Sequence, residues 1–176
     1  MTPSQHRAEI ERCAATHKVD PDVIEAMVWQ ESGSNTFAWN PEPRYRYFWN
    51  VKQGKPFRSV NGAETAAKVP PADFTSIGGD SDQEWWGQQA SWGLLQIMGA
   101  VAREQGFRGV YLVELSQPTL NLDIGCRFFA GLMKWAKGDT WQAVAAYNGG
   151  RGNWHGAAPQ AHAAKVRTWH GLVVGK

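Results

Sequence analysis

The chain has 176 residues, of which 43% are hydrophobic and 19% charged, and its formal net charge is +2. This length suits roughly one domain of ~150 residues, and the composition excludes disordered, collagen-like and coiled-coil chains. The small net charge argues against a protein that holds nucleic acid through many phosphate contacts. We therefore expect a soluble globular domain, monomeric and without a nucleic-acid partner.

The charge is distributed unevenly along the chain. Residues 1–90 carry nine Lys and Arg against twelve Asp and Glu, whereas residues 91–176 carry nine against four. This basic half favours weak contact with an anionic envelope surface, although a solvated face without a partner explains it equally well. Cys13 and Cys126 are too few for a disulfide framework and are interpreted as small buried apolar groups.

Two helices are predicted near the start of the chain. Residues 4–17 favour a mixed polar helix. Asp20 and Pro21 then supply an N-cap and a proline in the first turn of a second helix, which ends at Gly33. Residues 1–20 lack the apolar run of a signal peptide, and no stretch approaches the ~20 apolar residues of a membrane span. We expect any export to use another route.

The second helix carries a carboxyl group at a position where its pattern predicts a core residue. Its apolar stripe consists of Ile24, Met27 and Val28, with i, i+3, i+4 spacing, and the i+7 position is Glu31. Burial and the negative end of the helix dipole both favour the protonated carboxyl, the form that a general acid needs. The alternative is a side chain at a helix end that points to water.

Residues 34–90 differ in character from the rest of the chain. They hold five prolines and few periodic apolar positions, and with Trp92 they account for eleven of the 21 aromatic residues. A segment of this length is too long for a featureless loop in a compact domain. We expect an inserted lobe with short helices or a hairpin, in which the aromatic residues are divided between packing and a binding surface.

Helical patterns return after this segment. From Ser91 the residues are apolar nearly all round, which predicts a central buried helix in which Gln96 is the exception. Further helices are predicted at about 121–136, at 140–148 and at about 160–172. The last of them has an apolar side formed by Val166, Trp169 and Leu172. Because there is no internal repeat and no series of alternating strands, the fold class is mainly α.

Three short segments, taken in order, resemble a known family. They are Glu31-Ser32-Gly33, then Gly93-Leu94-Leu95-Gln96, and finally Ala145-Ala146-Tyr147-Asn148-Gly149, with Asn121-Leu122-x-x-Gly125 before the last. The set resembles the lytic transglycosylases of the soluble-lytic-transglycosylase and goose-type-lysozyme superfamily, whose patterns are E-S, G-L-[LM]-Q and A-Y-N-[AG]-G. The resemblance implies one lysozyme-like domain over residues 1–176, with the inserted lobe lining the cleft, and it is most like phage lysins.

The resemblance implies a role for each matching residue. Glu31 matches the single catalytic acid and base, which protonates the β-1,4 glycosidic oxygen between N-acetylmuramic acid and N-acetylglucosamine in peptidoglycan. It then takes the proton of the muramoyl C6 hydroxyl, so that a 1,6-anhydro product forms without water. Gln96 matches a glutamine that binds sugar or orients the acid, and Tyr147 matches a tyrosine whose hydroxyl reaches it. Ser32 and Asn148 match residues that contact the substrate.

Each of these residues also has a purely structural interpretation. A bond to backbone accounts for Gln96, and ordinary core packing accounts for Tyr147. Helix capping accounts for Asn148, and a hydroxyl in the last helical turn accounts for Ser32. The family patterns favour the functional interpretation of Gln96 and Tyr147, and Asn148 ranks lower.

Aromatic rings stack on the apolar faces of sugars, and we expect about one third of the aromatic cluster to face the cleft. The cluster comprises Trp39, Tyr45, Tyr47, Phe48, Trp49, Trp85 and Trp86. No cofactor is implied, because the sequence contains no phosphate loop and no nucleophile elbow. The resemblance implies a single catalytic carboxyl, with the acetamido group of the substrate in place of the second carboxylate that most glycosidases use. The loosely spaced His155, His162 and His170 are not interpreted as metal ligands.

Two other functions stay open. A goose-type lysozyme would hydrolyse the same bond and would need an acid that positions water, with Glu42, Asp80, Asp82 and Glu84 as candidates. A non-catalytic wall-binding or virion module would use the aromatic residues alone. The favoured expectation is a phage endolysin or virion-associated lysin. It is made in the host cytoplasm and reaches the periplasmic or cell-wall peptidoglycan after holin-type release or as a virion component.

Overall fold

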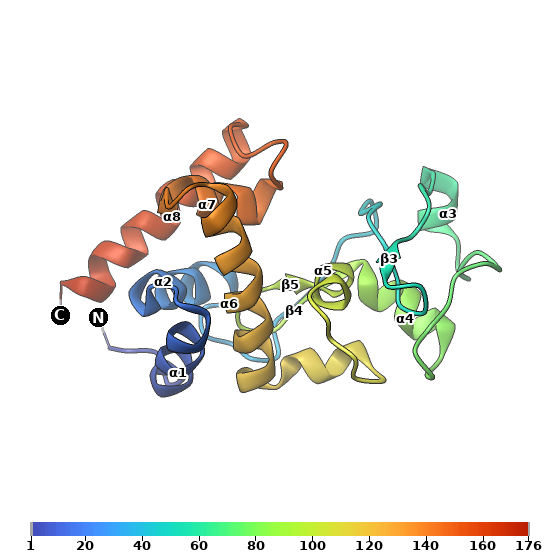
Figure 1. The fold of residues 1–176 in the computed structure, drawn as a ribbon, viewed down its shortest axis with the longest axis horizontal. Helices are drawn as coiled ribbons and strands as arrows, with labels where there is room; N and C mark the ends of the chain where they lie inside the picture. Colours follow the sequence, from blue (N-terminus) through green and yellow to red (C-terminus); the bar gives the residue numbers. More distant parts are fainter. Residues whose placement is uncertain (1, 176) are drawn as a thin grey trace. The chain divides into compact units, whose positions relative to one another are not determined.

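The computed structural model of the protein describes residues 2–175 and is mainly helical, as predicted (Figure 1). The chain divides into two compact units. The first comprises Met1–Asn35 together with Gly125–Lys176, and the second comprises Thr36–Ile124. The boundary falls within helix α6 (Pro118–Trp135).

The first unit is built from helices. They are α1 (Arg7–His17), α2 (Pro21–Ser32), the C-terminal part of α6, α7 (Thr140–Gly149) and α8 (Ala157–Val174). Helix α2 packs against both α1 and α8, and α8 also packs along α7 (Figure 1). Between α2 and α8 the rings of Trp29 and Trp169 stack with their centroids 5.9 Å apart. The predicted helices at both ends of the chain are thus confirmed.

Helix α2 begins and ends where the sequence predicts. The Asp20 carboxylate accepts a hydrogen bond from the Asp22 N–H at the start of the helix. At the other end Gly33 has a φ of 59°, and its N–H donates to the Trp29 carbonyl. A glycine adopts this left-handed conformation without steric strain, so the helix ends at Ser32. The position of the last turn, which carries Glu31, is therefore defined by the Gly33 cap.

The apolar side of α8 differs from the prediction by one residue. Val166 is fully buried and Trp169 is partly buried, but Leu172 is 49% exposed and Val173 is buried in its place. Leu172 follows Val166 by six residues, which turns it about 240° around the helix axis, whereas a spacing of seven returns Val173 to the same side.

The second unit holds the short strands and short helices. Strands β1 (Trp39–Pro41), β4 (Ala90–Trp92) and β5 (Ile97–Met98) form an antiparallel sheet in the order β1-β4-β5, and β2 (Trp49–Asn50) pairs with β3 (Lys55–Pro56). The helices are α3 (Gly62–Ala66), α4 (Ser81–Gln88), α5 (Gly99–Glu104) and the 3-10 helix η1 (Leu112–Ser116). The short helices and hairpin expected in residues 34–90 are present.

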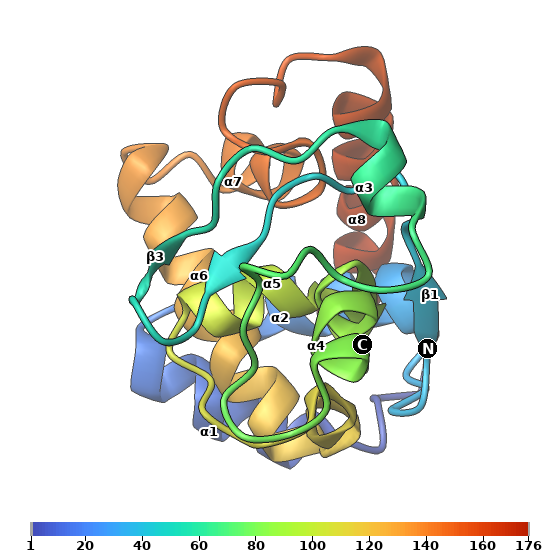
Figure 2. The ribbon, with the colours of Figure 1, turned by 90° about the vertical axis from the view of Figure 1, so that its right-hand side faces the viewer.

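Helices α4 and α5 approach each other closely (Figure 2). A Cβ atom on Gly99 would lie 2.1 Å from the Gly87 carbonyl oxygen, so only glycine fits at this contact.

The prediction of a helix from Ser91 is wrong. The chain runs through β4, a tight turn and β5, and α5 begins only at Gly99. Gly93 and Gln96 have φ values of 67° and 45°, which a right-handed helix excludes. Most of the apolar residues of this segment are buried, as predicted, but they belong to two short strands and the turn between them and not to a helix. An apolar run indicates burial and does not by itself distinguish a helix from strands.

Asn121 holds this turn in place from the first half of α6. Its side chain is fully buried, accepts a hydrogen bond from the Leu95 N–H and donates to the carbonyls of Trp92 and Leu115. A Cβ atom on Gly93 would lie 2.6 Å from the Asn121 amide nitrogen. The glycine and the asparagine of the family pattern therefore fit against each other.

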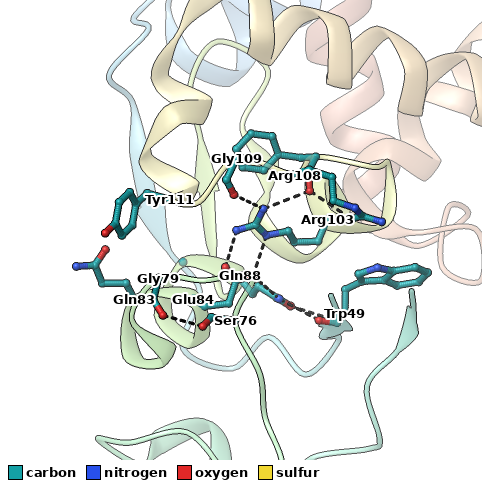
Figure 3. A network of polar contacts seen from close by, with 12 residues as sticks. Trp49, Ser76, Gly79, Gln83, Glu84, Gln88, Arg103, Arg108, Gly109 and Tyr111 are labelled. Carbon is teal, nitrogen blue, oxygen red and sulfur yellow. Dashed lines mark hydrogen bonds and ion pairs between the residues drawn. The ribbon is translucent and has the colours of Figure 1, made fainter. Parts of the chain in front are cut away.

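A buried ion pair ties α4 to α5 and to the loop that follows α5 (Figure 3). The Arg103 guanidinium donates to both carboxylate oxygens of Glu84, over 2.8 and 2.6 Å, and to the Gly109 carbonyl over 2.7 Å. Gln88 donates to the same carboxylate, and its side-chain oxygen accepts from the Trp49 N–H. The network links four segments of the second unit.

Replacement of Glu84 by Gln should destabilise the protein strongly. The substitution keeps the side-chain shape but leaves the buried Arg103 cation without its counter-charge, which typically costs about 3–5 kcal/mol. Urea denaturation should show a clearly lower midpoint. The control is Asp73→Asn at the exposed Arg58–Asp73 pair, where solvent screens the interaction and the midpoint should move little. Equal midpoints for the two variants would contradict the structural role of the network.

Candidate active site

Glu31 lies in the last turn of α2, where its side chain is 15% exposed. A titratable side chain of α8 lies beside it: His162 Nε2 is 3.1 Å from Glu31 Oε1, and the His162 side chain is 10% exposed. The distance is that of an ion pair, but the contact is not aligned as a hydrogen bond. Glu31 is thus a partly buried carboxyl whose neighbour is an imidazole.

Tyr147 of α7 lies close enough to Glu31 for the carboxylate charge to act on it. Burial of the phenol raises the Tyr147 pKa well above 10, and the nearby Glu31 carboxylate raises it further. Its ring packs against Phe128 of α6, with centroids 5.2 Å apart. The phenol therefore stays protonated at neutral pH, and its hydroxyl can act as a hydrogen-bond donor. Tyr147 and Glu31 thus lie in the same part of the first unit, and a bond between the hydroxyl and the carboxyl stays a prediction.

Ser32 and Asn148 also belong to the first unit. The Ser32 hydroxyl donates to the Val28 carbonyl over 3.1 Å, the local bond of a serine in the last helical turn. Asn148 is exposed near the end of α7. Their contact with substrate stays a prediction.

Gln96 belongs to the second unit and lies in the turn between β4 and β5. Its amide nitrogen donates to the carbonyls of Ala38 and Gly93, over 3.1 and 3.0 Å, and its oxygen accepts from the Ser91 hydroxyl over 2.8 Å. These bonds use both amide hydrogens, so a sugar hydroxyl can reach only the second acceptor position of the oxygen. A role of Gln96 in sugar binding stays a prediction.

The aromatic cluster divides into packing residues and exposed residues. Phe48 and Trp85 are buried in a small core with Val60 and Phe74, and their rings stack with centroids 4.1 Å apart. These two side chains are not accessible to a sugar. Trp39, by contrast, is 55% exposed.

The exposed indoles lie around a shallow pocket of about 160 Å³. Its lining includes Trp39, Trp86 and Trp92 together with Leu112 and Val113. The Trp39 and Trp92 rings lie side by side across the β1–β4 ladder, with centroids 6.1 Å apart. This pocket of the second unit therefore presents aromatic side chains to solvent.

Two of the four acids considered for a hydrolase have structural functions. Both carboxylate oxygens of Glu84 are bonded to Arg103 in the buried ion pair. Asp80 caps α4 by accepting hydrogen bonds from the Asp82 and Gln83 N–H groups. Neither carboxylate is placed to activate a water molecule.

His162 is the residue that the sequence analysis missed. The spacing of His155, His162 and His170 fits no metal motif and gives no other sign of a site. The informative signal is the position of His162 relative to the apolar residues of α8: Val166 follows at i+4 and Trp169 at i+7. Like Glu31 in α2, His162 is a polar residue on the buried side of its helix.

A comparison with protein families now places the chain. The transglycosylase SLT domain family matches residues 9–169, so the chain belongs to this family. Membership implies a lysozyme-like fold and lytic transglycosylase activity on peptidoglycan. A search of curated proteins found no match.

Within the described residues 2–175, no helix is both long and apolar enough to cross a membrane. These residues contain no group of three or more His, Cys, Asp or Glu side chains that would hold a metal ion. Cys13 and Cys126 form no disulfide, and both side chains are buried, as predicted.

Replacement of Tyr147 by Phe should slow catalysis more than it affects folding. The substitution removes the hydroxyl next to Glu31 and keeps the ring that packs on Phe128, so the loss of stability should not exceed about one hydrogen bond, ~1 kcal/mol. Kinetics on peptidoglycan strands should show a lower kcat with little change in KM, because a misoriented acid affects the transition state. A large drop in melting temperature with normal specific activity would instead make Tyr147 a core residue only.

Proposed function

We propose that the protein cleaves the β-1,4 bond between N-acetylmuramic acid and N-acetylglucosamine and releases 1,6-anhydromuramoyl ends, with Glu31 as the catalytic residue. The observation that supports this most is the setting of Glu31. It is a partly buried carboxyl at the end of α2, beside a protonated phenol and an imidazole, in a chain of the transglycosylase SLT family.

The chemistry needs a single carboxyl group. Protonated Glu31 donates its proton to the glycosidic oxygen, and the bond from this oxygen to C1 of the muramoyl residue breaks. The resulting carboxylate takes the proton of the C6 hydroxyl, whose oxygen bonds to C1 and closes the anhydro ring. Glu31 thus ends the cycle protonated again, and no water is consumed. The acetamido group of the substrate takes the place of a second carboxylate during this exchange.

Tyr147 and the fixed end of α2 serve this cycle by orientation. A carboxyl that first gives and then takes a proton must keep one position through both steps, because small displacements of a catalytic group reduce the rate strongly. The Tyr147 hydroxyl is a donor that remains protonated when Glu31 is ionised, so it can hold the carboxylate between the two steps.

We also propose that the enzyme is a phage lysin, either an endolysin or a virion component, that reaches the wall of the host cell after holin-type release or during entry. The support is the arrangement of the three family patterns in this sequence, which resembles phage-type lysins most. A goose-type hydrolase remains the alternative outcome, and no contact described above favours it.

Replacement of Glu31 by Gln should abolish lysis of purified cell walls. The amide keeps the shape of the side chain but cannot donate and recover a proton, so the rate should fall about 10²-fold or more. Turbidity loss of a wall suspension measures this rate, and melting curves show whether the variant is folded. Glu11→Gln, at an exposed glutamate of α1, is the matched control and should lyse like the wild type. Substantial activity of folded Glu31→Gln would contradict the proposed function.

A further inference from the structure

The contact between Glu31 and His162 has an unusual feature. His162 Nε2 is buried, and it has no hydrogen-bond partner among residues 2–175, although Glu31 Oε1 is 3.1 Å away. Buried ring nitrogens are normally bonded, because an unpaired polar atom in the interior is unfavourable. Because the distance is already short, a rotation of either side chain would align His162 Nε2 with Glu31 Oε1 and form this hydrogen bond.

The groups around His162 leave Glu31 as its charged partner. Helix α8 packs against α2 and α7. On α2, Asp22 and Glu25 are bonded to Arg7, over 2.7 and 2.6 Å, which leaves Glu31 as the carboxylate that faces α8. On α7, the titratable group is Tyr147, whose phenol stays protonated.

We propose that His162 is a positioning residue for Glu31. Its Nε2–H donates to Glu31 Oε1 when the carboxyl is ionised, so that Oε2 is the oxygen that exchanges the proton with the glycan. The proton of Nε2 stays on the imidazole throughout. The mobile proton leaves Glu31 for the glycosidic oxygen and returns from the C6 hydroxyl. This assignment rests on the proposed function of Glu31.

Three further considerations support this role over packing alone. The imidazole comes from a different helix than the carboxyl, so the bond would fix the end of α2 relative to α8. The Trp29–Trp169 stack also packs between these two helices, so their contact does not rest on His162 alone. Finally, Tyr147 approaches from α7, and two donors from two helices define a carboxylate orientation better than one.

The test compares His162→Leu and His162→Gln on soluble, uncrosslinked peptidoglycan strands. Leucine fills the space without a donor, whereas glutamine supplies an N–H and cannot take a charge. We expect kcat to fall at least about tenfold in His162→Leu with KM changed less than about twofold, because only the orientation of the acid is lost. His162→Gln should recover most of the wild-type kcat. In a Glu31→Gln background, His162→Leu should have no further effect on the residual rate.

His170→Leu is the matched control. His170 lies on the same helix, two turns further on, and its ring contacts Trp141. This variant should keep the wild-type kcat. If His162→Leu melts below the assay temperature, His162→Met replaces it, because methionine adapts to irregular space.

An unchanged kcat in a folded His162→Leu or His162→Met variant would overturn the assignment. So would a His162→Gln variant that is as slow as the apolar one, since a packing residue is not rescued by a donor. Equal rates for wild type and Glu31→Gln would overturn the proposed function itself, a result distinguishable from the failure of His162 alone.

Discussion

The position of one helix end is the constraint on which the proposed chemistry of Glu31 depends. A carboxyl group that acts as an acid and then as a base in one cycle must stay in one place. Helix α2 provides this because its first turn is capped by Asp20, its last turn is ended by Gly33, and its middle is buried against α1 and α8. The ion pair between Arg7 of α1 and the buried Glu25 of α2 also connects these two helices. The last turn therefore presents Glu31 in a defined direction.

The sequence predicted this part of the molecule well because local rules determine it. The cap, the proline and the terminal glycine are short-range signals, and the apolar stripe places Glu31 on the buried side. The family pattern added Tyr147, which the structure brings close to Glu31. His162 was missed because its relation to Glu31 is a contact between two helices far apart in the sequence, and no local rule encodes such a contact.

The segment that contains Gln96 shows the opposite case. Its apolar run was interpreted as a helix, whereas the backbone makes a turn between two short strands. The deciding partner is Asn121, whose side chain bonds three backbone groups at and beside the turn and replaces the bonds that a helix would supply. A buried turn and a buried helix share the same apolar composition. The difference lies in a tertiary hydrogen-bond network that periodicity does not reveal.

The central claim is that one carboxyl group, Glu31, carries both proton transfers without water. The most direct test is mass spectrometry of the muropeptides that the purified protein releases from purified walls. The account predicts new ends in the 1,6-anhydro form, which are lighter by one water than reducing ends. Products with reducing ends would contradict it and would show that water attacks the muramoyl carbon, as in a hydrolase.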